Sequence, residues 1–492
     1  MQNIVCITEI VIFEKSNNLH YKNPMNILNN INSLFKILDK ERYFIVFLFL
    51  ILLFANMFFV DILPSANTNS RAIPMVSFYK YQTLQMDSFA KVPGFLDYAL
   101  INNHYYTDKP PLPMFASLPF YYIIKKTGII NETITSDNPG WFAYWLGGFL
   151  TGAIPFVLII TIIYSKLRAL GFVRNIVIMS VFPLIGSFIF VFAQSFYSHI
   201  FAALLMLLSY IYLKEKRFAL FGLFAGLAFL CEFQLIILIG LWFAILLYNE
   251  RKLKPVLYAT LSISPSIIFI LIYNYIYTGS PFDMLSKYVC NTFKEMHSYY
   301  GFRLPSLKSL WGLTFSPYRG MFIYMPILFV YLYYFIKNDL QIILSKKIFS
   351  NYIVLPFVIY LLYISSYFYW HAGATFGPRY FMAILIILNY ASLVRYYQYL
   401  KNNMFFYLFA SIGIIISFIG KITTRMSLNE NIANPIIDKV FPMFTKQQFH
   451  PFNIFTQLAG ISPIISYITW IVSFVIVILF VNQLKNKSNL KN

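Results

Sequence analysis

Long apolar runs separated by short charged breaks dominate this sequence. Twelve runs, most of about 16–23 residues, lie at 43–60, 140–164, 175–193, 197–213, 217–231, 233–249, 255–277, 319–336, 351–369, 380–395, 403–420 and 463–482. A helix needs about 20 apolar residues to cross the hydrocarbon core of a bilayer, so each run is a candidate transmembrane helix. The sequence therefore predicts an all-α polytopic membrane protein with about twelve transmembrane helices.

Composition excludes two other classes of protein. Hydrophobic residues make up 59% of the 492 residues and charged residues only 11%, which is too few charges for a soluble protein of this length. The net charge of +20 would favour a nucleic-acid partner in a soluble protein, but most of the excess can be placed on one side of a membrane, and no nucleic acid is expected. Cys6, Cys231 and Cys290 form no CxxC pair, which argues against a disulfide or zinc framework.

Basic residues orient the predicted helices. With the amino terminus inside, 22 of the 38 Lys and Arg residues fall in short inner segments, as the positive-inside rule requires. We therefore expect both termini to be cytoplasmic, with an amino-terminal segment at 1–42, one transmembrane domain at 43–482 and a tail at 483–492. Met25 is an alternative start, and the run at 43–60 is expected to stay as a signal anchor.

Loop length is concentrated on the outer side. The three long outer segments are 61–139, 278–318 and 421–462, whereas every inner loop is short. Because functional residues are commonly carried on long loops, the working surface is predicted on this face, with 421–462 covering the site or meeting a substrate. Pro111 to Lys126 is expected to form a short apolar helix that lies at the interface.

The first outer segment holds the candidate catalytic groups. Six of the ten outer Asp and Glu residues lie in it, and Asp87, Asp97 and Asp108 are candidate general bases. Lys109 follows Asp108 directly and could pair with a lipid phosphate at the headgroup level. The alternative is that these two are solvated loop charges at a helix start. Candidate substrate-binding residues in the same stretch are His104, Tyr105 and Tyr106.

Four further ionisable residues are predicted in the same leaflet. His199 begins the fourth run, Glu232 separates the fifth from the sixth, and Arg319 and Arg379 open the eighth and tenth. Ionisable groups near membrane depth usually face a cavity or a partner, and Arg can hold a phosphate with two donors. Taken singly, each Arg could instead snorkel to the interface, and His199 could be a satisfied buried residue. Their convergence on one leaflet favours function, with substrate binding for His199 and Glu232 and phosphate binding for the arginines.

Four stretches of the sequence resemble a known family. They are Asn69-Ser70-Arg71 followed by Leu84-Gln85-Met86-Asp87; Asn103-His104-Tyr105-Tyr106-Thr107-Asp108-Lys109-Pro110; Phe315-Ser316-Pro317-Tyr318-Arg319-Gly320; and Trp370-His371-Ala372-Gly373 with Phe376-Gly377-Pro378-Arg379-Tyr380. In combination they resemble the polyprenyl-phosphate-dependent membrane glycosyltransferases of the GT-C fold, which include the protein O-mannosyltransferases and the lipid A aminoarabinose transferase. The resemblance covers about residues 43–395 and is strongest to an uncharacterised bacterial branch.

The resemblance implies both a fold and a reaction. The fold would be GT-C-like, with interfacial helices in the first outer loop. The reaction would be an inverting transfer from a polyprenyl-phosphate sugar donor to a hydroxyl of a lipid, glycan or protein acceptor, at the outer face of a bacterial inner membrane. Membrane lipid would be a further partner, and a divalent metal stays open as a cofactor.

Site residues carry over by position in the shared stretches. Lys109 matches a phosphate-contacting lysine, and Asp108 matches the acidic residue just before it. Arg71 matches the arginine of an Asp-x-x-Arg motif, but Thr68 stands at the position of that motif's aspartate. The general base is thus one of Asp108, Asp87 and Asp97.

Two other functions fit a protein of this kind. A multi-pass transporter or lipid-linked-sugar flippase would be expected to show repeated halves and broken helices near the midplane, and the sequence shows neither pattern. A polysaccharide ligase usually carries its largest outer loop late in the chain, whereas here the largest is the first.

Overall fold

The computed structural model describes residues 41–59, 61–62, 64–290, 295, 301–451 and 453–489. The chain forms two compact units, Met1–Leu48 and Phe49–Asn492. Of the first unit only the start of helix α2 (Glu41–Met57) is described, so the expectations for 1–40, including Cys6 and Met25, lie outside the described residues. All that follows concerns the second unit.

Helices occupy each of the twelve predicted runs within the described residues. The helices in these runs are α2, α5 (Phe142–Gly148), α6 (Ile154–Ala169), α7 (Ile176–Ile185), α8 (Phe188–Val191), α9 (His199–Lys214), α10 (Phe218–Phe229), α11 (Ile236–Glu250), α12 (Leu253–Thr278), α14 (Met321–Tyr324), α15 (Ile327–Asp339), α16 (Val354–Ser365), α17 (Met382–Leu400), α18 (Met404–Ile422) and α21 (Pro463–Asn489). Six helical segments in the described residues are long and apolar enough to cross a membrane. The structure is therefore that of a mostly helical protein with the spans of an integral membrane protein, and the number twelve stays a prediction.

Further helical elements lie between these helices in the described part of the chain. The α-helices among them are α3 (Ala66–Tyr81), α4 (Leu112–Lys126), α13 (Leu307–Thr314), α19 (Phe441–Thr445) and α20 (Ile454–Ala459). The single-turn elements are η2 (Asp87–Phe89), η3 (Phe149–Ala153), η4 (Phe233–Leu235), η5 (Leu285–Tyr288), η8 (Leu340–Ile342), η9 (Lys346–Ser350), η10 (Arg379–Phe381) and η11 (Ile436–Val440). Of these, η3 is a π-helical turn that joins α5 to α6 into one long helix.

Two of the predicted runs are not continuous helices. The run at 175–193 breaks between α7 and α8, where Gly186 ends the first helix and Ser187 is extended. The run at 319–336 breaks between α14 and α15 at Pro326, which has no N–H to donate to the preceding turn. Hydrophobicity alone could not show these breaks, because the residues on both sides of each are apolar.

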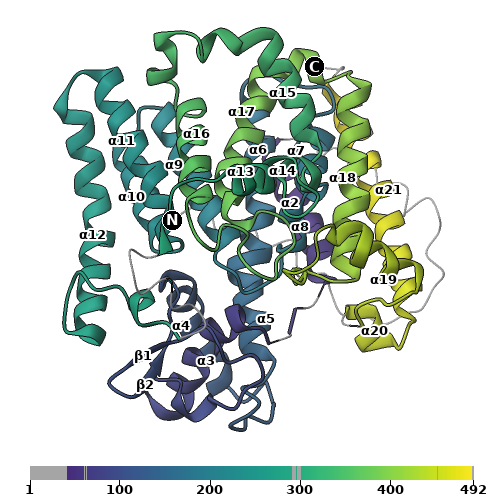
Figure 1. Ribbon diagram of the computed structural model, residues 1–492. Coiled ribbons are helices and arrows are strands. Elements are labelled where there is room, and N and C mark those ends of the chain that lie inside the picture. The colour runs from purple at the N-terminus through teal and green to yellow at the C-terminus, as the bar shows by residue number, and fades with distance from the viewer. Residues whose placement is uncertain are drawn as a thin grey trace, which may run out of the picture. The chain divides into compact units, whose positions relative to one another are not determined.

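The first outer segment folds into a small layer of its own (Figure 1). It contains α3, α4 and an antiparallel hairpin of β1 (Ala99–Ile101) and β2 (His104–Tyr106). Asn102 and Asn103 both have positive φ, at 51° and 66°, which is the backbone that a two-residue type I′ turn requires. The predicted short helix is confirmed as α4, and its location at the interface stays a prediction, whereas α3 and the hairpin were not expected from the apolar pattern.

An apolar core attaches this layer to the helices. Ile73 and Val76 of α3 pack with Met114 and Tyr121 of α4 and with Phe142 of α5, and all five side chains are buried. The backbone N–H of Leu112 also donates to Leu230 O over 3.1 Å, which connects the start of α4 to the end of α10. The layer is thereby held at the end of the bundle where α10 finishes and α9 begins.

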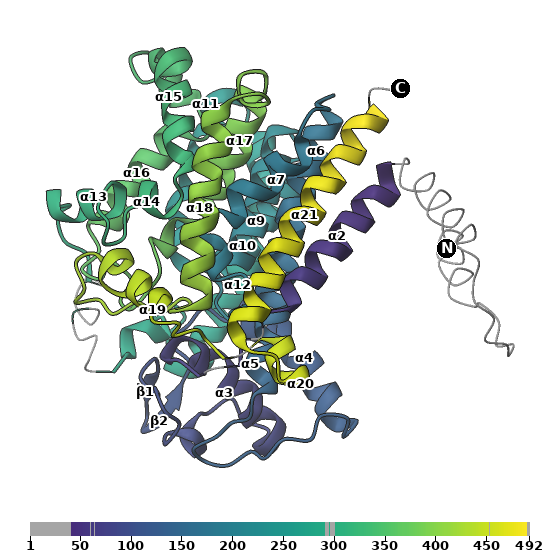
Figure 2. The same cartoon turned by 90° about the vertical axis from the view of Figure 1, so that its right-hand side faces the viewer.

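The last long helix closes another side of the second unit. Figure 2 shows α21 beside the part of α2 that belongs to this unit, and Trp470 Nε1 donates to Ala55 O over 2.9 Å. Trp470 also stacks on Phe418 of α18 and on Phe474 of its own helix, with ring centroids 5.8 and 4.9 Å apart. Trp470 thus joins α21 to α2 by a hydrogen bond and to α18 by an aromatic contact.

Close packing of α10 on α12 leads to a stability prediction. A Cβ at Gly222 would lie 2.1 Å from Ala259 O, so Gly222→Ala must push the two helices apart. We expect a loss of about 1–3 kcal/mol and a lower unfolding temperature in detergent, measured by intrinsic fluorescence. The matched control is Gly240→Ala in α11, where a Cβ would meet nothing within 4 Å and the higher helix propensity of alanine should raise or preserve stability. Equal unfolding temperatures for Gly222→Ala and the unmodified protein would contradict this packing.

Candidate functional site

Lys109 lies between two carboxylates at the end of the hairpin. Its Nζ is 2.8 Å from Asp97 Oδ2 and 2.8 Å from Asp108 Oδ2, and the three side chains are only 19%, 10% and 8% exposed. Burial lowers the pKa of Lys109, but the charges and hydrogen bonds of Asp108 and Asp97 outweigh it, so that the pKa lies above its ordinary value. The lysine is therefore a fixed cation, and the three groups together carry one negative charge when both carboxylates are ionised.

Helix α3 holds Asp108 through Ser70. Ser70 Oγ donates to Asp108 Oδ1 over 2.9 Å and lies 2.9 Å from Thr107 Oγ1. Because Ser70 sits one residue before Arg71, the same turn of α3 presents a hydroxyl and a guanidinium to the site. The hairpin and α3 thus position Asp108 jointly, and both of its carboxylate oxygens are occupied.

A second chain of polar contacts runs from Arg71 into the bundle. Arg71 Nη1 donates to Asn67 O over 2.9 Å, and Nη2 donates to Ser198 Oγ over 2.7 Å. Ser198 in turn donates to Glu232, and His199 Nδ1 lies 2.9 Å from the same carboxylate oxygen, Glu232 Oε1. All of these side chains are buried. The contacts join α3, the start of α9 and the turn between α10 and η4.

Glu232 has a further partner on its other oxygen. Gln234 Nε2 donates to Glu232 Oε2 over 2.6 Å. With Ser198, His199 and Gln234 all directed at it, the carboxylate is fully engaged. Ser198 thereby links the pair of Glu232 and His199 to Arg71.

Arg379 completes the cluster and differs from Lys109 in its partners. Its guanidinium lies over the rings of Tyr197 and Tyr380, 5.5 and 5.7 Å from their centroids, and interacts electrostatically with Asp97 and Glu232. Within the described residues it forms no ion pair, and its buried Nε has no hydrogen-bond partner. Arg71 Nε is buried without a partner as well. Guanidinium donors of this kind suit an oxyanion such as phosphate.

Seven of the site residues that were predicted from the sequence lie together in the structure. The gathered residues are Arg71, Asp97, Asp108, Lys109, His199, Glu232 and Arg379. Three carboxylates face three permanent cations in this set, so with a neutral His199 the cluster is close to electroneutral. We refer to these seven residues as the outer cluster.

The other predicted site residues lie in separate contacts. Asp87 accepts from the backbone N–H of Tyr105 over 2.7 Å, and its other oxygen is 2.7 Å from His104 Nδ1. This pair is 36% and 48% exposed. Tyr105 packs against Phe95, and the Tyr106 hydroxyl accepts from Gln85 Nε2. These residues fix the shape of the hairpin.

Arg319 has a structural environment. It is fully buried, and its guanidinium donates to the backbone oxygens of Tyr318 at 2.7 Å and of Gly373 and Leu428 at 3.2 Å. These carbonyls belong to three different loops. Arg319 therefore joins the loops, whereas the sequence analysis expected it to bind a phosphate.

Thr68 has a local role at the position where the resemblance expects an aspartate. It is the N3 residue of a capping box at the start of α3, in which Thr68 N donates to Ser65 Oγ and Ser65 N donates to Thr68 Oγ1 over 2.9 Å. Such reciprocal bonds satisfy two otherwise free N–H groups of the first helical turn. The side chain is buried and its hydroxyl is engaged with Ser65.

Four residues of the site were missed by the sequence analysis. Ser70, Ser198, Tyr197 and Tyr380 contact the outer cluster. Each is within two residues of a predicted site residue, so adjacency was the only signal. Neutral hydroxyl and aromatic side chains are too common in this chain to stand out by themselves.

Two further observations concern ligands and relatives. Among the described residues, no group of three or more His, Cys, Asp or Glu side chains is placed to hold a metal ion. No known protein family, curated protein or solved structure matches the chain at a significant level.

The bridge at Lys109 leads to a second prediction. Lys109→Met leaves two buried carboxylates facing each other without a cation, and removal of one partner from a buried ion pair costs about 3–5 kcal/mol. We expect a loss of that size in denaturant unfolding, with partial recovery in Lys109→Met/Asp97→Asn. Because the pKa of Lys109 is raised on folding, its contribution is fully present below the unfolded value of about 10.4 and is lost only as the pH rises through the folded value.

The control for this prediction is Lys287→Met, whose partner Asp283 is 2.8 Å away in a pair that is 44% and 31% exposed. An exposed pair of this kind contributes about 0–1 kcal/mol. Equal effects of the two lysine substitutions would show that the Lys109 bridge is not buried as described.

Proposed function

We propose that the protein is a membrane glycosyltransferase that moves a sugar from a polyprenyl-phosphate donor to a hydroxyl acceptor. The observation that carries the proposal is Arg379, a cation without a carboxylate partner among the described residues, beside the carboxylates of the outer cluster. A transferase of this kind needs a base for the acceptor and a cation for the departing phosphate at one place. The resemblance of four sequence stretches to the GT-C family supports the same reaction.

Asp97 is the best candidate for the general base. Its Oδ2 pairs with Lys109, and within the described part of the chain its Oδ1 accepts no hydrogen bond. Asp108 has both oxygens engaged, by Ser70 and by Lys109. A base must have an oxygen within hydrogen-bond reach of the proton that it takes, and Asp97 Oδ1 is the oxygen that is available.

The proposed step balances charge and atoms. The acceptor oxygen forms a bond to the anomeric carbon while the bond from that carbon to the phosphate oxygen breaks, and the electron pair leaves with the phosphate. The acceptor proton moves to Asp97 Oδ1. The donor phosphate changes from one negative charge to two, and Arg379 with Lys109 and Arg71 stabilises that added charge.

The position of the outer cluster suits a donor that cannot leave the bilayer. Its residues lie where α9 begins and α10 ends, next to the layer of α3, α4 and the hairpin, which Figure 1 draws at the bottom of the view. We propose that this end faces outward from a bacterial inner membrane, with both termini cytoplasmic and about twelve spans in a GT-C-like arrangement. A transporter would need its binding groups near the middle of the spans, whereas these groups gather at one end.

The test is release of polyprenyl phosphate by the purified full-length protein. Given a panel of polyprenyl-phosphate hexoses and pentoses with a detergent-extracted acceptor fraction, the unmodified protein should release the lipid phosphate. Asp97→Asn should lower the rate about 10²–10⁴-fold, because a positioned base contributes that much. Asp87→Asn is the matched comparison, since Asp87 pairs with His104 outside the outer cluster, and it should keep most of the activity.

Two outcomes would reject the assignment at different levels. A larger loss in Asp87→Asn than in Asp97→Asn would move the base out of the outer cluster. No release from any donor by stable, folded protein would reject the transferase function and favour transport.

A further inference from the structure

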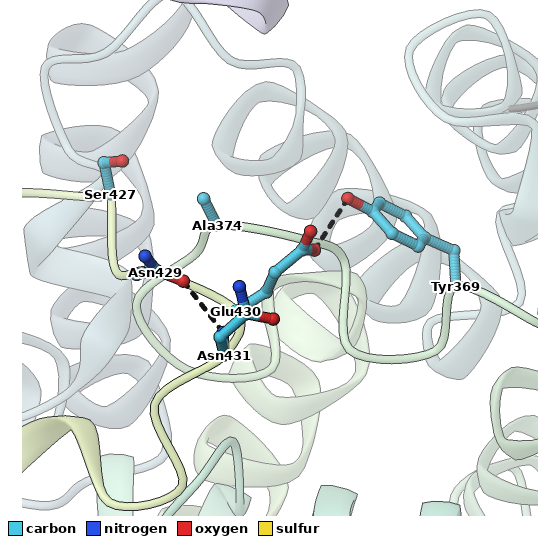
Figure 3. A pocket seen from close by; sticks show the side chains of 6 residues that line it. All are labelled: Tyr369, Ala374, Ser427, Asn429, Glu430 and Asn431. Carbon is cyan, nitrogen blue, oxygen red and sulfur yellow. Dashed lines mark hydrogen bonds between the residues drawn. The ribbon is translucent and has the colours of Figure 1, made fainter. Parts of the chain in front are cut away.

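A polar pocket lies on the loops that follow α16 and α18. It has a volume of about 470 Å³. Its lining residues are Tyr369, Ala374, Ser427, Asn429, Glu430 and Asn431 (Figure 3). Two come from the loop that leads to Arg379, and four come from the outer segment that the sequence analysis expected to meet a substrate. Pockets of this size hold ligands of small-molecule dimensions.

The groups in the pocket are held by their neighbours. Tyr369 donates its hydroxyl to Glu430 Oε2 over 3.0 Å, and the Tyr318 hydroxyl donates to Glu430 O over 2.7 Å. Asn431 N donates to Asn429 Oδ1 over 2.8 Å. Figure 3 shows the Glu430 and Tyr369 side chains directed toward each other across the pocket. The backbone and side chain of Glu430 are therefore fixed from two different loops.

The chemistry of this lining fits a neutral, polyhydroxylated ring. A carboxylate accepts hydrogen bonds from hydroxyls, a primary amide both donates and accepts, and a tyrosine ring offers an apolar face. None of the described Lys or Arg side chains lines the pocket, which makes it a poor site for a phosphate or another anion. Glu430 already receives a hydrogen bond from Tyr369, which leaves it less free to neutralise a cation.

The pocket is close to the outer cluster along the chain. Ala374 precedes Arg379 by five residues, so their Cα atoms are at most about 18 Å apart. The Tyr369 hydroxyl interacts electrostatically with both Glu430 and Arg379. A chain of two or three sugar rings is long enough to cover such a distance.

We propose that this pocket binds a neutral sugar unit of a carbohydrate acceptor, one or two units away from the hydroxyl that reacts at Asp97. The assignment of this sugar to an acceptor rests on the proposed transferase function, whereas the binding of a neutral sugar does not. The pocket would then select acceptors that already carry a glycan over single sugars and over unglycosylated lipids or peptides.

The experiment is saturation-transfer NMR on the full-length protein in nanodiscs, without any donor. The probes are maltotriose, mannotriose and chitotriose, with spermidine as a cationic comparison. We expect at least one trisaccharide to bind and spermidine not to bind. Glu430→Gln keeps the shape and the backbone contact of the residue, and Asn431→Ala removes one amide, so each should weaken binding at least tenfold.

The matched control is Asp283→Asn, a partly exposed carboxylate outside the pocket, and this variant should bind as the unmodified protein does. No trisaccharide signal, a signal that survives both pocket substitutions, or binding of spermidine in place of the sugars would overturn the proposal. Because no donor is present, sugar binding by a protein that never releases polyprenyl phosphate would keep the pocket and reject only its role as an acceptor site.

Discussion

Hydrocarbon offers no hydrogen bonds, and this constraint explains where the protein keeps its irregular backbone and its buried charges. Within a bilayer the backbone must satisfy itself in helices, and ionisable groups must find partners or stay near the surface. The apolar helices meet the first condition, and the outer cluster meets the second at one end of them. Polar groups that form no hydrogen bond within the long helices are paired in three places. These are the capping box of α3, the hairpin, and the contacts of Arg71, Ser198 and Glu232.

Within the outer cluster, the balance of positive and negative charges suggests the kind of reaction. Two anions around Lys109 make a group with a net negative charge, and Arg71 is linked to Glu232 through a serine. Arg379 and Arg71 form no ion pair with a carboxylate within the described residues, and the Nε of each is buried without a hydrogen-bond partner. A site that holds a base and an unneutralised guanidinium is suited to a reaction in which a proton is taken and an anionic group leaves.

Sequence patterns were sufficient for the helices and for most of the outer cluster, because both follow from simple physical rules. Apolar length predicted the runs, and ionisable residues placed in one leaflet predicted that Lys109, His199, Glu232, Arg319 and Arg379 would lie together, whereas Arg71 was indicated by the family resemblance. The patterns did not predict the breaks at Gly186 and Pro326, the hairpin turn or the roles of Thr68 and Arg319. Each of these depends on which backbone groups meet in three dimensions, and composition does not record such contacts.

The most direct measurement is a cryo-EM structure of the full-length protein in nanodiscs with bound polyprenyl phosphate, the product of the proposed transfer. We expect the phosphate to lie against Arg379 and to accept charge-assisted hydrogen bonds of about 2.7–2.9 Å from its guanidinium. We also expect it to lie near Asp97 and Lys109. A phosphate bound away from the outer cluster, for instance at the buried pair of Arg425 and Asp61, would contradict it.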